Sequence, residues 1–134
     1  MEFVKDFIWT PGLKADELLK RLSKVGLQGT ELNRAADLII RMKKESARIY
    51  LAFPSNLVTS GLRGFFAQLV KLKIPDILVT TAGAIEEDIM KAIGERFQIG
   101  SFFTDDVALH EQGANRIGNI IIKNESYEKF EDKI

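Results

Sequence analysis

The possible folds of this chain are constrained most by two short apolar runs. Each run is followed by a turn of small polar residues and then by a helical pattern. The runs cover 49–53 and 77–80 and are too short for core helices, so they indicate strands buried on both faces. Between them, apolar residues recur at helical spacing: Leu62, Phe65, Phe66, Leu69 and Val70. Strand, turn, helix and strand in this order predict a right-handed βαβ crossover, and therefore an α/β fold with a mainly parallel sheet.

The amino-terminal third of the chain is predicted to be helical. Residues 1–14 read as an irregular arm, because Pro and Gly interrupt them. A helix is expected from Ala15 until Gly26, and a second helix is expected to be capped by Thr30. The chain contains no repeat or obvious linker, so the sequence predicts one α/β domain over residues 1–134.

The pattern is weaker after Gly94. It suggests a strand at 99–103, a helix at 105–112, and an apolar run at 117–122 that Gly118 and Asn119 interrupt. Ser126 is a candidate cap for a last helix.

Composition excludes several classes of protein. Hydrophobic residues make up 46% of the 134 residues, which argues against disorder. Acidic and basic residues balance at 19 each, so no global field attracts nucleic acid or an anionic membrane. The chain has no cysteine, and His110 is its only histidine, which excludes thiolate and multi-histidine metal sites. With no signal peptide or long apolar run, we expect a soluble cytoplasmic protein.

The carboxyl ends of the two predicted strands are the candidate ligand site, because ligands of parallel α/β sheets bind there. Residues 55–61 follow the first strand and are rich in hydroxyl and amide groups that can hold a phosphate at a helix start. The alternative is that Thr59 or Ser60 merely caps the next helix.

Acidic residues follow the second predicted strand. The turn at 80–84 consists of small residues, which let a ligand approach the backbone, and Glu86, Glu87 and Asp88 come directly after it. Three carboxylates would repel a phosphate, so this end should prefer a cation or a sugar hydroxyl. The alternative is the ordinary preference of helix starts for acids. The Gly-rich dinucleotide and P-loop fingerprints are absent.

Three longer segments give the sequence a family resemblance. Residues 53–63 (FPSNLVTSGLR) resemble the TSNLISSGLR-type segment of deoxyhypusine synthases, and residues 79–88 (VTTAGAIEED) resemble their VTTAGGVEEDL segment. Residues 115–120 (NRIGNI), with 124–132 (NESYEKFED), are similar to their NRIGN…NENYxxFED segment, and residues 26–30 (GLQGT) look like their GFQAT. The order and spacing agree along essentially the whole chain.

The resemblance implies an activity and a fold. Deoxyhypusine synthases transfer an aminobutyl group from spermidine to one lysine of translation initiation factor 5A. NAD oxidises spermidine, the resulting NADH later reduces an imine, and an enzyme lysine carries the intermediate. The implied fold is a Rossmann-like doubly wound sheet, of which this chain would be an incomplete amino-terminal portion, in an enzyme that is a tetramer.

The resemblance also implies site residues. Glu86 and Glu87 match the acidic pair that faces the polyamine, and Glu87 would also approach the nicotinamide ribose. NAD contacts are implied for two groups, one after each predicted strand: Ser55, Asn56, Leu57, Val58 and Thr59, and then Thr81, Ala82 and Gly83.

Two residues depart from the family pattern: Ala84 stands where a second glycine is usual, and Pro54 replaces a common threonine. The family's carboxyl-terminal half, with its catalytic lysine, has no match here. We therefore assign no catalytic or metal-binding residue and expect the chain to be inactive alone. The expected partner is another copy or a complementary carboxyl-terminal chain. The alternatives are a catalytically dead regulatory or binding paralogue that pairs with a full-length synthase, and a generic dinucleotide-binding domain.

Overall fold

The computed structural model describes residues 3–134, which form two compact units, one that ends at Arg48 and one that covers Ile49–Ile134. The first unit contains α1 (Ala15–Leu22) and α2 (Leu27–Lys44). Residues 3–14 contain no helix or strand, and Arg21 of α1 donates a hydrogen bond of 2.7 Å to the carbonyl of Ile8. The expectation of a single domain over residues 1–134 stays a prediction.

The start of α2 differs from the prediction. The helix begins at Leu27, and Gly26 is its N-cap with φ of 89°, a conformation that glycine adopts readily. Thr30 therefore lies inside the helix and does not cap it. Helix α1 ends earlier than expected, at Leu22 with Ser23 as its C-cap, so Gly26 starts the second helix and does not end the first.

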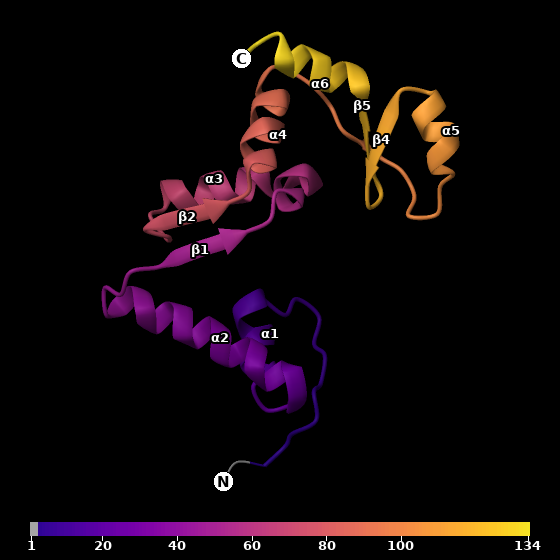
Figure 1. The fold of residues 1–134 in the computed structure, drawn as a ribbon. Helices are drawn as coiled ribbons and strands as arrows, with labels where there is room; N and C mark the ends of the chain where they lie inside the picture. The colour runs from indigo at the N-terminus through magenta and orange to yellow at the C-terminus, as the bar shows by residue number, and fades with distance from the viewer. Residues whose placement is uncertain (1–2) are drawn as a thin grey trace. The chain divides into compact units, whose positions relative to one another are not determined.

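The second unit begins with the predicted parallel strand pair. Strand β1 (Tyr50–Phe53) pairs with β2 (Ile77–Thr80) in parallel, with Tyr50 opposite Ile77 and Phe53 opposite Thr80. The crossover between them contains η1 (Val58–Leu62) and α3 (Arg63–Lys71), and α4 (Ala82–Ala92) follows β2 (Figure 1). The α/β class is confirmed, and the parallel register puts the ends of both strands at one edge of the sheet.

The first turn after β1 is unusual. Element η1 is a π-helical turn, and Gly61 within it has φ of 99°, so the backbone kinks before α3 begins. A side chain at Gly61 would be strained, although the space around it is open. Single π-turns inside helices often occur at functional sites.

The remaining elements form a small antiparallel sheet in the order β3 (Gln98–Ile99), β5 (Ile120–Lys123) and β4 (Ala114–Ile117). Helix α5 (Asp106–Glu111) precedes β4, and α6 (Asn124–Glu131) follows β5. The glycine and asparagine that interrupt 117–122 form the hairpin turn. Helix α6 begins at Asn124, so Ser126 is not its cap; Ser126 is buried and donates a hydrogen bond of 2.6 Å to Glu95.

A small core joins the crossover to α4. Val58, Phe66 and Ala84 are buried together, and the ring of Phe53 stacks on that of Phe66 with centroids 3.8 Å apart. Because Val58 and Ala84 each belong to a loop-to-helix junction, this packing fixes the two strand-end segments against each other. Among the described residues 3–134, no helix is long and apolar enough to cross a membrane.

Candidate functional site

The segments that follow β1 and β2 lie side by side. The backbone N–H of Ser55 donates a hydrogen bond of 3.1 Å to the hydroxyl of Thr81. A Cβ atom at Gly83 would lie 3.2 Å from both the Cβ and the Oγ of Ser55, which is closer than most real contacts. Glycine at position 83 thus permits the close approach of the two segments, and the predicted neighbourhood of 55–59 and 81–83 is confirmed.

Neither hydroxyl that could have capped α3 does so. The N-cap of α3 is Leu62, with no side-chain hydrogen bond. The hydroxyl of Ser60 donates to the carbonyl of Leu57 at 2.9 Å, and that of Thr59 points to α4. The capping explanation for the polar residues in 55–61 is therefore wrong.

Thr59 and Glu87 form a buried polar pair. These residues are 3% and 5% exposed, and the Thr59 hydroxyl donates a hydrogen bond to the Glu87 carboxylate. A buried carboxylate is costly unless it is paired and hydrogen-bonded. Within residues 3–134, it is the only hydrogen bond between two buried side chains.

Burial raises the pKa of Glu87 above the usual carboxyl range. The hydrogen bond from Thr59 and the positive charge of Lys91 act in the opposite direction, while the neighbouring charge of Glu86 raises the pKa further. A desolvated carboxylate held by one hydroxyl interacts strongly with a cationic ligand, because little water screens it.

Lys91 stands one turn after Glu87 on α4 and reaches the π-turn. Its ammonium donates hydrogen bonds to the carbonyls of Val58 at 2.6 Å and Thr59 at 3.0 Å, and it lies 4.8 Å from the ring centroid of Phe97. Burial lowers the pKa of Lys91, and the nearby Glu87 charge opposes that shift. Sequence reasoning missed this residue, although its spacing of four from Glu87 placed both on one helix face.

The three acids of α4 are not a helix-start feature. Helix α4 begins at Ala82 and has no acidic residue in its first turn, whereas the effect of the helix dipole falls off within that turn. The helix-start explanation for Glu86, Glu87 and Asp88 is therefore wrong. Their roles differ, because Asp88 forms an ion pair with Arg63 of α3, whereas Glu87 accepts from Thr59.

Glu86 is half-buried and has no hydrogen-bond or ion-pair partner within residues 3–134. Tyr127 of α6 lies near it: burial raises the pKa of Tyr127, and the charges of Glu86 and Glu87 add to that shift. The acidic pair therefore lies near α6, and of its two carboxylates only that of Glu87 has a hydrogen-bond partner within residues 3–134. Sequence reasoning did not single out Tyr127, and only the packing of α6 on α4 brings it close.

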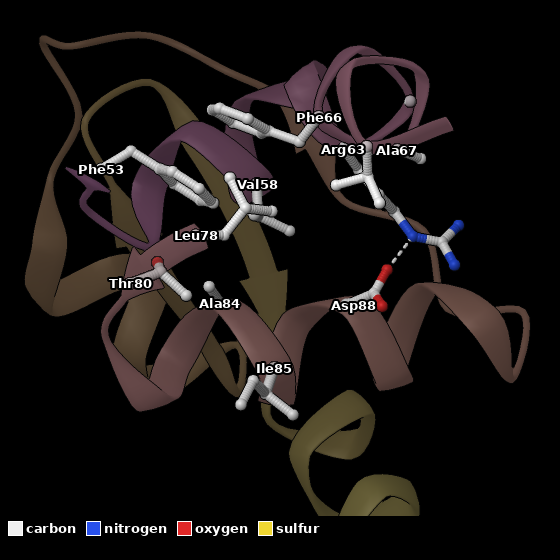
Figure 2. A pocket seen from close by; sticks show the side chains of 12 residues that line it. Phe53, Val58, Arg63, Phe66, Ala67, Leu78, Thr80, Ala84, Ile85 and Asp88 are labelled. Atoms are coloured by element: carbon white, nitrogen blue, oxygen red, sulfur yellow. Dashed lines mark hydrogen bonds and ion pairs between the residues drawn. The ribbon is translucent and has the colours of Figure 1, made fainter. Parts of the chain in front are cut away.

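An apolar cavity lies elsewhere on α4. It has a volume of about 630 Å³ and is mainly apolar, with Phe53, Phe66 and Leu78 among its lining residues. Figure 2 shows Arg63 reaching Asp88 at its rim, with Ile85 on the same helix. Neither Glu86 nor Glu87 lines it. We therefore regard it as an uncovered part of the α/β layers, since Ile85 is 62% and Val70 is 49% exposed.

The residues assigned to NAD by resemblance differ in access. The side chains of Val58 and Thr59 are buried, whereas those of Asn56, Thr81 and Ala82 are exposed. Backbone and small polar groups of 55–56 and 81–83 thus form the accessible surface of the strand ends. Within residues 3–134 no cluster of His, Asp and Glu could hold a metal ion, and His110 is exposed on α5.

The fold and the strand-end segments define an incomplete Rossmann-like α/β protein. The family model of deoxyhypusine synthase matches residues 17–134. This chain belongs to the deoxyhypusine synthase family.

Individual relatives agree. The chain is 39% identical over 135 residues to a "Probable deoxyhypusine synthase" of Schizosaccharomyces pombe, covering 92% of this chain and 38% of the relative. A protein of the same description from Pyrococcus furiosus is 38% identical over 129 residues, with 92% of this chain and 38% of the relative covered. A crystal structure assigned to a deoxyhypusine synthase of Entamoeba histolytica superimposes with a TM-score of 0.51 at 37% identity, over 69% of this chain and 40% of that one. The chain thus spans less than half the length of these relatives.

Proposed function

We propose that this chain is the part of a deoxyhypusine synthase that supplies one wall of the NAD and spermidine site. The reaction is the NAD-dependent transfer of the aminobutyl group of spermidine to a lysine of translation initiation factor 5A. The observation that carries the proposal is the buried Thr59–Glu87 pair, which joins the segment after β1 to α4. Beside it lies the carboxylate of Glu86, which has no partner within residues 3–134.

The strand ends fit a dinucleotide. Ser55, Asn56 and Thr81 offer small polar groups. Gly83 lies against Ser55 and has no side chain, so no bulky group covers the start of α4. The side chain of Thr81, the N-cap residue of α4, makes no capping hydrogen bond, so the first backbone amides of α4 can face a ligand. When bound, NAD would supply the hydride acceptor for spermidine oxidation. Leu57 and Val58 would support this surface from beneath, since both pack in or against the core.

The acidic pair fits a polyamine. Spermidine is a multiple cation, and a carboxylate in a desolvated setting holds an ammonium through a charge-assisted hydrogen bond. Glu87 is fixed by Thr59, and Glu86 is free to accept from a ligand, so the two carboxylates can hold and orient one cationic chain beside the nucleotide surface.

The site needs residues beyond these 134. We propose that the complementary carboxyl-terminal part of a synthase, as the same or a separate polypeptide, supplies the lysine that carries the aminobutyl group. The uncovered apolar cavity between α3 and α4 supports this proposal, because such a surface is stable when further structure packs on it.

A transfer assay tests the proposal. Labelled spermidine, NAD and initiation factor 5A are incubated with the chain alone and with the chain plus the complementary part of a relative. We expect transfer only in the combined sample. Transfer by the 134 residues alone would contradict the claim that further residues are needed. A combined sample that binds NAD but transfers nothing would favour a regulatory paralogue.

A further inference from the structure

We propose that Lys91 is a positioning residue for the acidic pair: its ammonium ties the Val58 and Thr59 carbonyls to α4 and so holds the Thr59 hydroxyl against the Glu87 carboxylate. This inference rests on the proposed function only where substrate binding is concerned. The contacts themselves are two hydrogen bonds, of 2.6 and 3.0 Å, across 33 and 32 positions of the chain.

The first step is mechanical. The π-turn and the kink at Gly61 leave residues 58–62 without the regular geometry of an α-helix. Lys91 reaches this segment from the opposite element, and its ammonium is the only side-chain donor to the carbonyls of Val58 and Thr59 within residues 3–134. The same segment carries the hydroxyl that Glu87 accepts. Lys91 and Glu87 thus hold Thr59 by its two polar ends.

The second step is electrostatic. Among the described residues, Lys91 is the one cation that lowers the pKa of Glu87, against burial and against the charge of Glu86. The groups that face this site come from three elements: the hydroxyl of Thr59 on η1, Glu86 and Lys91 on α4, and Tyr127 on α6. Lys91 in turn lies in the field of Arg63 and Asp88. Removing its charge leaves only the hydrogen bonding of Thr59 to oppose burial and the charge of Glu86, so the Glu87 carboxylate becomes protonated at a higher pH.

The third step is the contact with Phe97. The ammonium sits 4.8 Å from the ring centroid, which favours a cation over a neutral amine at that position. The Lys91 ammonium is therefore held by two carbonyls and one aromatic ring, unlike the ammonium of a solvated surface lysine.

The test compares Lys91→Met, Lys91→Arg and a control, Lys71→Met, in the assembly that contains the complementary part of a synthase. Lys71 is exposed at the end of α3, so its loss should change nothing here. We measure the pH dependence of spermidine kcat/KM, the Kd of NAD, and hydrogen exchange of the peptide that contains residues 55–62.

Lys91→Met should speed exchange in 55–62 and move the acidic limb of the spermidine profile to higher pH, with about a tenfold loss of kcat/KM on that limb. Lys91→Arg should restore the limb, because it keeps the charge and can donate to both carbonyls. If Lys91→Met exchanged faster but its acidic limb did not move, Lys91 would have only a structural role and the proposal would be overturned. The proposal would also be overturned if Lys91→Arg did not restore the acidic limb of the pH profile. If the wild type does not use spermidine at all, the proposed function fails, while unchanged exchange in Lys91→Met would separately refute the positioning role.

Discussion

The hydroxyl of Thr59 donates a hydrogen bond to the carboxylate of Glu87, 28 positions later in the chain, and both residues are buried. This contact links the segment after β1 to the helix after β2. It also explains why a carboxylate can be kept at the edge of a small apolar core, since burial without a donor would be costly.

Removing the Thr59 hydroxyl should therefore destabilise the protein. Thr59→Val keeps the shape but leaves Glu87 without its donor, so we expect the free energy of unfolding at pH 8 to fall by about 1 to 3 kcal/mol. Thr59→Ser keeps the hydroxyl and should lie close to the wild type. Denaturant unfolding measures both. Equal stability of the valine variant and the wild type would mean that the hydrogen bond does not stabilise the fold.

Glu87 should make stability depend on pH. Its pKa is raised in the folded state, so the folded protein holds the proton more tightly than the unfolded chain. The stability that this proton contributes is complete below the ordinary carboxyl pKa and is lost as the pH rises through the raised pKa. Glu87→Gln mimics the neutral acid, so it should match the wild type near pH 4 and be more stable at pH 8. Thermal unfolding across this range measures the stability difference between Glu87→Gln and the wild type. If Glu87→Gln became less stable than the wild type as the pH rose from 4 to 8, the prediction would be contradicted.

The contact of Gly83 with Ser55 should limit what position 83 tolerates. A methyl group there would lie 3.2 Å from two atoms of Ser55 and push the segments apart, so Gly83→Ala should weaken NAD binding by about tenfold through a strain of about 1 to 2 kcal/mol. Gly64→Ala is the matched control, because nothing lies within 4 Å of a Cβ at that helical position. Calorimetric titration with NAD compares the two, and equal affinities would show that the close approach does not shape the cofactor surface.

The chain should associate through its uncovered surfaces. The β1–β2 sheet has two strands and hence two open edges, while Ile99 and Phe103 are 89% and 96% exposed. We expect a dimer or larger assembly that buries more than about 1,000 Å². Sedimentation at micromolar concentration measures this, and a clean monomer would contradict the expectation.

The local part of this structure could be predicted from the sequence. The apolar runs at 49–53 and 77–80 indicated β1 and β2, and the strand ends followed from parallel topology. The predicted burial of these strands on both faces was wrong, since every residue of β2 is exposed. The hairpin at 114–123 was not predicted, because its two strands are short and the sequence showed only an apolar run at 117–122 that Gly118 and Asn119 interrupt.

The long-range part could not be predicted. Whether Thr59 caps a helix or meets Glu87 depends on how α4 packs on the crossover, and no local pattern carries that information. Ser126 was misread for the same reason, since a serine near a helix start looks like a cap until Glu95 is placed beside it. Lys91 looked like an ordinary helical lysine, and only the fold aims it at the π-turn.

The acidic residues of α4 allow one control within the same helix turn. Asp88 is paired with Arg63 at the rim of the apolar cavity, so Asp88→Asn should leave spermidine use unchanged within about twofold. A large loss in this variant would mean that the cation site extends to the cavity side of α4.

The most direct measurement is the spermidine kcat/KM of Glu86→Gln and Glu87→Gln, with the Kd of NAD, in the assembly that carries out the transfer to initiation factor 5A. Each change keeps size and removes one charge. Since a hydrogen bond to a charged group contributes roughly 1.5 to 3 kcal/mol, each variant should lose about tenfold or more in spermidine kcat/KM and less in NAD affinity. Unchanged spermidine kinetics in both variants would contradict the account that this acidic pair is the polyamine wall of a deoxyhypusine synthase.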